Sequence, residues 1–285
     1  MGRMTLLGAT VFINLDRDTA RRTHMESECA KAGLSPMRLS AANGAALEEE
    51  LRAYFPHAGD QERSFLSPGE TGCYASHLTI CRRIVSGELQ APVLVFEDDI
   101  ELHDGFAALI ERTLQTLPAD WDIVRLSNDT KQVAAPLAEL GGRYDLVRYS
   151  TIPGSTGALM FSRTGAEKFL AAEARDLPID QDLKRVWHWG LNTFGVLPAP
   201  VRRDIFDTSS IDAIGGEGHR SKKKRQARLR AHRRSEARAR FAHGVRSFGA
   251  GRWILAESLS ALIALAPKRS RPSLLMRANR LFAGA

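Results

Sequence analysis

The most constraining feature of this 285-residue chain is a short apolar run that ends in three consecutive carboxylates. The run Val93–Phe96 follows Pro92 and is too short for a helix, so it predicts a buried strand of a parallel sheet. Glu97, Asp98 and Asp99 come next, at the strand end where such sheets bind ligands. Adjacent carboxylates repel one another, so they favour a divalent cation that carries a substrate phosphate. The alternative is a solvated acidic turn.

The first part of the chain predicts a βαβ unit. Residues 10–15 are an apolar strand, residues 17–32 an amphipathic helix closed by Gly33, and residues 37–42 a second strand. This order and spacing favour a largely parallel sheet. Three arginines, Arg17, Arg21 and Arg22, follow the first strand, where a nucleotide phosphate would lie. A solvated helix face is the alternative explanation for them.

A second helix is predicted over residues 71–85. Ser67 and Pro68 suit its first turn, and Gly87 suits its end. The helix carries Ser76 and His77. A single helical histidine is more often a core or capping residue than a catalytic one, so both readings remain open at this point.

Further elements follow in regular order. A helix is expected over 106–117, strands over 121–126, 147–151 and 157–161, and a helix over 164–174 capped by Ser162. Asp180 and Asp182 open a helix that reaches about Trp187, with carboxylates at its positive end. Residues 192–201 contain Pro198 and Pro200 and predict an edge strand.

The net charge of +7 is divided unevenly along the chain. Residues 219–240 contain eleven Lys/Arg and one Glu, whereas residues 1–218 carry a formal charge of −9. The acidic body disfavours nucleic-acid binding, and the basic run lacks aromatic residues for stacking on bases. Three cysteines without a CxxC pair, no signal peptide and no apolar segment of membrane-spanning length favour a cytoplasmic protein.

The composition changes at Gly215, where a Gly-rich linker leads into the basic run. Residues 253–265 then predict an apolar helix that is flanked by basic residues and is too short to span a bilayer. This pattern favours an interfacial anchor on the anionic inner face of a membrane. The alternative is that the helix packs on the acidic body while the basic run stays solvated.

Five segments together resemble one known family, glycosyltransferase family 25. In chain order they are VFINLDRDTARR (11–22), GETGCYASHL (69–78), VFEDDI (95–100), GALMFSRTGA (157–166) and PID (178–180). The resemblance covers roughly residues 10–215 and includes the bacterial lipooligosaccharide β-galactosyltransferases and the collagen galactosyltransferase domains. It divides the chain into a catalytic domain, 1–215, and a basic, partly helical membrane-association tail, 216–285.

The resemblance implies an α/β fold of the GT-A type, with a Rossmann-like mixed sheet flanked by helices. It also implies that Asp99, with Glu97, binds Mn²⁺ or Mg²⁺ on the diphosphate of a UDP-sugar. The residues it places along the nucleotide-sugar are Asn14, Leu15, Arg17, Arg22, Ser76, His77, Glu97 and Asp98. His219 is a further possible metal ligand by analogy with some GT-A enzymes.

The family is an inverting one, so the acceptor hydroxyl needs a general base. By the resemblance Asp180 is the first candidate and Asp182 the second, although both carboxylates could simply cap a helix. The expected reaction moves a hexose, with galactose the expected sugar, from UDP to a lipooligosaccharide or another glycan or glycolipid acceptor. The alternatives are a metal-dependent nucleotidyltransferase or phosphohydrolase, and a non-catalytic glycan- or lipid-binding protein.

Overall fold

The computed structural model of the chain describes residues 6–58, 66–127, 130–203, 205–206 and 222–282. The first half contains β1 (Ala9–Asn14), α1 (Thr19–Lys31), β2 (Pro36–Ser40), α2 (Glu49–Arg52), α3 (Pro68–Ser86), β3 (Val93–Glu97), β4 (Glu101–Leu102), α4 (Phe106–Thr116), β5 (Ile123–Arg125), β6 (Ala134–Gly141) and β7 (Tyr144–Tyr149). The remainder contains β8 (Ala158–Phe161), α5 (Arg163–Phe169), α6 (Ile179–Asp182), α7 (Val186–Trp189), β9 (Thr193–Leu197), β10 (Val201–Arg202), α9 (Lys222–Ser235), α10 (Ala237–Phe248), α11 (Ala250–Leu265) and α12 (Arg271–Arg280).

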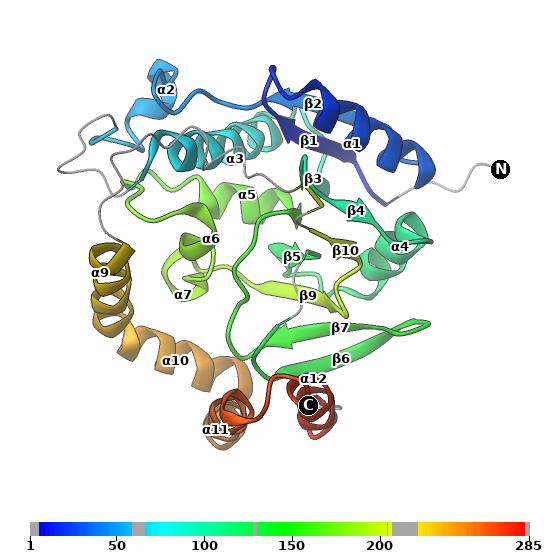
Figure 1. Ribbon diagram of the computed structural model, residues 1–285, viewed down its shortest axis with the longest axis vertical. Helices are drawn as coiled ribbons and strands as arrows, with labels where there is room; N and C mark the ends of the chain where they lie inside the picture. The colour runs from blue at the N-terminus through cyan, green and yellow to red at the C-terminus, as the bar shows by residue number, and fades with distance from the viewer. Residues whose placement is uncertain (1–5, 59–65, 128–129, 204, 207–221, 283–285) are drawn as a thin grey trace.

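An eight-stranded mixed sheet forms the centre of the molecule, in the order β2-β1-β3-β8-β5-β9-β7-β6 (Figure 1). β1 pairs in parallel with both β2 and β3, as the βαβ pattern predicts, and β5 pairs in parallel with β9. The pairs of β8 with β3 and with β5 are antiparallel, and so are the pairs of β7 with β9 and with β6. The predicted mixed α/β sheet of the Rossmann-like type is therefore confirmed.

Both faces of the sheet are covered, which explains the continuous apolar character of β3. Val93 and Val95 point into a core with α3 and α5, whereas Leu94 and Phe96 point into a second core with α1 and α4. All four side chains are buried. A strand with two apolar faces belongs inside a three-layer structure, and this position fixes where its acidic end emerges.

Local signals in the sequence explain how α3 begins and ends. The Ser67 side chain accepts a hydrogen bond from the Glu70 N–H, and the Glu70 side chain accepts one from the Ser67 N–H. Pro68 occupies the first turn, and Gly87 closes the helix with a φ of 85°. This capping box confirms the predicted helix start and positions the segment that carries Ser76 and His77.

Some predicted elements were wrong in extent or position. Residues 192–201 do not form an edge strand: β9 lies between β5 and β7, and Pro198 follows the strand without interrupting its hydrogen bonds. The helix expected from 178 to 187 is two short helices, α6 and α7, and α5 ends at Phe169. Strand β6 was not predicted, because its alanine-rich sequence and Pro136 give little strand signal.

The C-terminal helices pack on the outer edge of the sheet, at the bottom of Figure 1. A small apolar cluster joins Val133 and Ala135 to Ala256, Ile263 and Phe282 of the tail. Side chains of the tail also accept hydrogen bonds from the edge, since the Val133 N–H donates to Ser260 and the Ala134 N–H donates to Asn279. The tail thus covers backbone groups that an edge strand would otherwise expose.

The predicted linker at Gly215 and the candidate ligand His219 lie outside the described residues. Within the described part of the chain, no single helix has the length and apolar character needed to cross a bilayer. Only α10 and α11 taken together reach that threshold, and they meet at a bend of 114°.

Candidate active site

The acidic end of β3 lies beside the end of β1, and one carboxylate joins the two strands. Asp98 accepts hydrogen bonds from the Asn14 amide at 2.7 Å and from the Arg21 guanidinium at 2.9 Å. Asp98 is 9% exposed and Asn14 is 1% exposed. Arg21 also lies over the ring of Phe206, 4.9 Å from its centroid. These contacts hold the strand ends in register and use both oxygens of Asp98.

Glu97 and Asp99, on either side of Asp98, are placed differently. Glu97 accepts a hydrogen bond from the Thr156 hydroxyl. Burial raises the pKa of Glu97, and the charges of Asp98 and Asp180 add to that shift, against Thr156 and Arg203. Burial followed by the charge of Glu97 raises the pKa of Asp99 to about 6. Two carboxylates are therefore held close together in a partly desolvated place.

Asp99 has one oxygen, Oδ1, that is buried without a hydrogen-bond partner among the described residues. A buried carboxylate oxygen of this kind is suited to a hard cation, which prefers oxygen ligands. The described residues contain no group of three acidic, histidine or cysteine side chains arranged as a metal site. The pair Asp99 and Glu97 therefore fits a divalent cation only if substrate oxygens supply further ligands.

Asp180 and Asp182 have different environments, although they lie on the same short helix. Asp182 is 2% exposed, accepts a hydrogen bond from Tyr74 at 2.6 Å and pairs with Arg185 at 2.7 Å. Asp180 is half-buried and accepts a hydrogen bond from its neighbour Gln181. Its Oδ2 lies against Gly154, where a Cβ atom would be 3.2 Å away. Beyond the effect of burial, the charge of Asp180 raises the pKa of Glu97, so of the two carboxylates Asp180 is the one that lies near the acidic end of β3.

Ser76 and His77 lie on the face of α3 that points into the protein. The Ser76 hydroxyl donates to the Gly72 carbonyl at 2.8 Å and accepts from the Ala42 N–H at 2.9 Å. His77 is 1% exposed, and its Nδ1 lies 2.9 Å from the Cys73 carbonyl oxygen. These contacts fix α3 against the loop after β2. Direct contact of either side chain with a donor stays a prediction.

The remaining predicted donor-binding residues lie at the start of α1. Arg17 has a side chain that is 58% exposed, and the Arg22 side chain, 50% exposed, pairs with Glu26 on the outer surface. Leu15 is half-buried at the end of β1. Of the arginines in this segment, Arg21 is the one that the structure directs to the acidic group, through Asp98.

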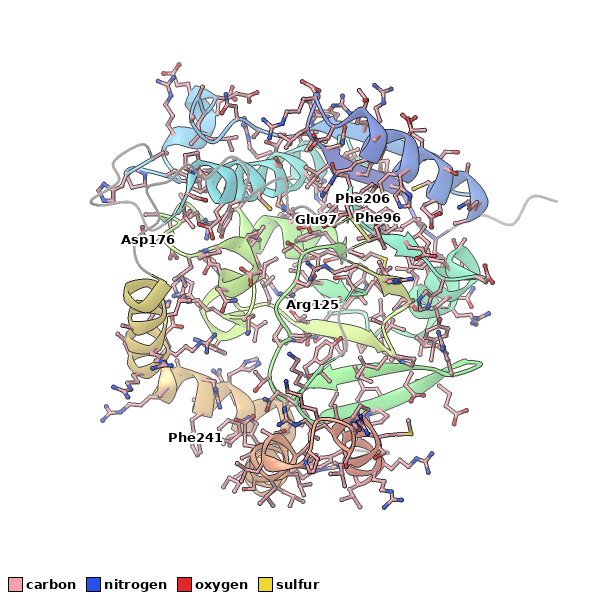
Figure 2. The ribbon with its side chains drawn as sticks, viewed as in Figure 1. Phe96, Glu97, Arg125, Asp176, Phe206 and Phe241 are labelled. Atoms are coloured by element: carbon pink, nitrogen blue, oxygen red, sulfur yellow. The ribbon has the colours of Figure 1, made fainter. Side chains whose placement is uncertain are left out.

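Two further cations at the site were not identified from the sequence. Arg125, at the end of β5, is 2% exposed and donates to the Ser155 carbonyl at 2.7 Å. Its Nε and Nη2 have no hydrogen-bond partner among the described residues, and burial lowers its pKa to about 10, against the charges of Tyr149 and Asp180. Arg203 lies against Gly157, and its charge lowers the pKa of Glu97 and of Asp99. Figure 2 shows Glu97 and Arg125 in the middle of the molecule.

A sequence signal for Arg125 exists: it is a lone charge near the carboxyl end of an otherwise apolar predicted strand. Such a charge is costly to bury unless a partner or a ligand compensates it. Arg203 offers no comparable signal, because it follows a predicted strand in a region with several basic residues.

Acidification is expected to destabilise the protein through His77. Burial lowers its pKa to about 4 from 6.5, so the unfolded chain binds more protons between those two pH values, and stability is lost as pH falls through that window. From pH 7 to pH 5 the wild type should lose about 2 kcal/mol more unfolding free energy than His77→Gln. Urea unfolding of both proteins at the two pH values measures this difference. Equal losses in the two proteins would contradict the assignment.

Comparison with known proteins agrees with this arrangement. The sequence model described as "Glycosyltransferase family 25 (LPS biosynthesis protein)" matches residues 9–182, which contain both acidic clusters. The chain is 30% identical over 182 residues to "Procollagen galactosyltransferase 1" of Danio rerio, covering 60% of this chain and 30% of that protein. It is 26% identical over 216 residues to "Procollagen galactosyltransferase 2" of Mus musculus, covering 72% of this chain and 33% of that protein.

A third relative is named as inactive. "Probable inactive glycosyltransferase 25 family member 3" of Rattus norvegicus is 29% identical over 194 residues, covering 60% of this chain and 31% of that protein. The chain thus spans about a third of the length of these relatives. Because the family model covers more than half of the 285 residues and ends at the second acidic cluster, the chain belongs to glycosyltransferase family 25.

Proposed function

We propose that the protein transfers a hexose, with galactose the expected sugar, from a UDP-sugar to a glycan acceptor with inversion at the anomeric carbon. The observation that carries this proposal is the arrangement at the end of β3, where Glu97 and Asp99 flank the Asp98–Arg21 ion pair. Burial raises the pKa of both carboxyls, the charge of Arg203 lowers it, and the charge of Asp180 raises that of Glu97 further. Lipooligosaccharide or another cell-surface glycolipid is the expected acceptor.

In the proposed reaction Asp99 and Glu97 would hold Mn²⁺ or Mg²⁺ together with the donor diphosphate. When bound, the cation would supply a positive charge that stabilises the departing UDP. Asn14 and Arg21 keep Asp98, and with it the two metal-binding carboxylates, in a fixed position. Arg203 adds a second positive charge next to these carboxylates.

Asp180 is proposed as the general base that accepts the proton of the acceptor hydroxyl. It is half-buried, and among the described residues it accepts a hydrogen bond from the neutral side chain of Gln181. Asp182 is less suited to this task, because Tyr74 and Arg185 occupy both of its oxygens. A carboxylate that is not committed to an ion pair can take a proton during attack.

Calorimetric titration with UDP-galactose, UDP-glucose, UDP and GDP-mannose, each with Mn²⁺ and with EDTA, tests the donor assignment. The proposal predicts metal-dependent binding of uridine nucleotides and weaker or no binding of the guanosine donor. Failure of every uridine nucleotide to bind would overturn the donor assignment. Selective, metal-dependent binding without later turnover would instead favour a non-catalytic glycan-binding role; one relative is itself named as probably inactive.

We also propose that the protein is cytoplasmic and associates with an anionic membrane through its tail. The outer face of α11 exposes apolar side chains, including Leu262 at 63% and Leu265 at 84%. The exposed residues Lys268 and Arg269 come soon after Leu265 in the chain, so basic groups follow the exposed apolar ones. Apolar insertion combined with attraction to anionic lipids suits an interfacial helix.

Replacing both Leu262 and Leu265 by Ser is expected to weaken binding to vesicles that contain phosphatidylglycerol. The loss of two exposed leucines should reduce the partition coefficient by roughly a hundredfold or more, since each buried leucine contributes about 1.5–3 kcal/mol and about 1.4 kcal/mol corresponds to a factor of ten. Co-sedimentation with vesicles measures the effect, and the buried Ile263 is left unchanged so that packing on β6 is retained. Unchanged binding would show that this face does not meet the membrane.

A further inference from the structure

A cavity of about 540 Å³ lies between the sheet domain and the C-terminal helices. One wall consists of residues 149–154 together with α6 and α7, and the opposite wall consists of α9, α10 and part of α11. Figure 1 shows α9 and α10 running past α6 and α7 on the same side of the molecule. The volume is within the usual range of small-ligand sites, about 300–1,000 Å³.

This cavity adjoins Asp180, the residue proposed as the base, through two of its lining residues. Gly154 and Gln181 both line it. The proposed base, Asp180, lies against Gly154 and accepts a hydrogen bond from the Gln181 amide at 2.6 Å. A molecule in the cavity would therefore lie next to two residues that contact Asp180.

The cavity carries an excess of positive charge. Its lining contains five lysine or arginine residues and two glutamates, which gives a net charge of +3 with the histidines neutral. The two glutamates are already used, since Glu236 pairs with Arg185 and Glu257 pairs with Arg240. Lys131, Lys184 and Arg233 form no ion pair with a described residue; the Arg233 guanidinium donates to the neutral Gln181 side chain at 3.1 Å.

The pKa of Lys184 reflects the positive charge around the cavity. Burial lowers its pKa, and the charges of Arg233, Arg125 and Arg240 lower it further, with Asp180 opposing them. Several cations are thus close enough to repel one another in a partly desolvated space. An anionic group bound among them would relieve this repulsion and would form charge-assisted hydrogen bonds.

The cavity also contains an aromatic side chain suited to a sugar. Trp187 lines it, and its indole Nε1 is buried without a hydrogen-bond partner among the described residues. An indole has an apolar face for a sugar ring and one N–H donor for an oxygen atom. The Ser150 hydroxyl, also in the lining, has no partner among the described residues either.

We infer that this cavity is the acceptor site, and that the acceptor is an anionic saccharide carrying phosphate or carboxylate near the sugar that is extended. The inference rests on the proposed transferase function and assigns the positioning to residues outside the family match, two of them just beyond its end and one on α9. Lys184 and Arg233 bind the anion, and Trp187 packs against the sugar. The tail is thus a wall of the active site as well as the proposed membrane contact.

Binding of model ligands tests the inference without any need for turnover. Ligand-observed NMR measures the Kd of glucose 6-phosphate, glucose and inorganic phosphate, each with and without saturating UDP. We expect glucose 6-phosphate to bind at least about tenfold more tightly than either fragment, because it uses both the cations and Trp187. We expect UDP to leave this affinity unchanged, since the proposed donor-binding carboxylates Glu97 and Asp99 do not line the cavity.

Substitution of lining residues tests whether glucose 6-phosphate binds in this cavity. Arg233→Gln and Lys184→Gln should each weaken glucose 6-phosphate binding by about tenfold or more, as expected for loss of a charged hydrogen bond. Arg234→Gln is the matched control, because Arg234 is the exposed neighbour of Arg233 on α9 and does not line the cavity. Arg233 is itself exposed, so its substitution is not expected to perturb folding.

Two results would overturn the inference. Inorganic phosphate that binds as tightly as glucose 6-phosphate would indicate an anion site without a saccharide. Displacement of glucose 6-phosphate by UDP, together with weaker UDP binding to Arg233→Gln, would assign the cavity to the donor. Failure of UDP-sugars to bind the wild-type protein would instead contradict the proposed transferase function. Glucose 6-phosphate binding would still report on the cavity in that case.

Discussion

Replacing Asp99 with Asn is expected to reduce metal-dependent UDP release by roughly a thousandfold, because the metal's charge stabilisation of the leaving group is worth several kcal/mol. Asp99 is the carboxylate of the cluster with a buried oxygen that lacks a partner among the described residues, whereas Asp98 and Glu97 accept hydrogen bonds from the protein. An amide at position 99 is a weaker ligand for a hard cation.

Asp104→Asn provides the control for this substitution. Asp104 is an exposed acidic residue that follows the same strand region, five positions beyond Asp99. Asp104→Asn removes one negative charge, as Asp99→Asn does, but leaves the proposed metal ligands unchanged. Initial rates and the Mn²⁺ dependence of UDP affinity are compared for the wild type and both variants. Asp99→Asn activity within tenfold of the wild type would contradict the assignment of Asp99 as a metal ligand.

Replacing Asp180 and Asp182 separately is expected to give two different phenotypes. Asp180→Asn should lower kcat by about 10²- to 10⁴-fold, the usual contribution of a general base, with donor affinity and stability unchanged. Asp182→Asn should instead lower the free energy of unfolding by about 3 kcal/mol, because it breaks a buried ion pair. Tyr74 would lose a charged acceptor, while Arg185 would keep Glu236.

Kinetics and urea unfolding of the two variants separate these roles. Activity of Asp182→Asn is expressed per folded molecule, so that loss of stability is not counted as loss of catalysis. An Asp180→Asn protein with full kcat would exclude Asp180 as the base. An unchanged free energy of unfolding in Asp182→Asn would contradict the structural role that its contacts with Tyr74 and Arg185 indicate.

The parts of the fold that the sequence predicted are those with local causes. The start of α3 follows from the Ser67, Pro68 and Glu70 pattern, and the burial of β3 follows from its apolar run between Pro92 and Glu97. The parallel pairing of β1 with β2 follows from the length of the helix between them. These features need only neighbouring residues for their explanation.

The features that were missed depend on contacts between distant segments. Strand β9 is interior because β7 and β6 pair beyond it, which no property of residues 192–201 reveals. The tail covers β6 through Val133 and Ala256, more than a hundred residues apart in the sequence. Asp180 and Asp182 could not be distinguished either, since their difference lies in Tyr74, Arg185 and Gly154.

The most direct test of the proposed function is product analysis with UDP-galactose in the presence of Mn²⁺ or of EDTA. The account predicts Mn²⁺-dependent release of UDP. Without an acceptor, hydrolysis should give free galactose; with an acceptor, galactose should be found in β-linkage to the glycan. The same reaction should stop in EDTA and in Asp99→Asn. Formation of UMP or pyrophosphate in place of UDP would contradict the account and assign the carboxylate cluster to phosphate-bond chemistry.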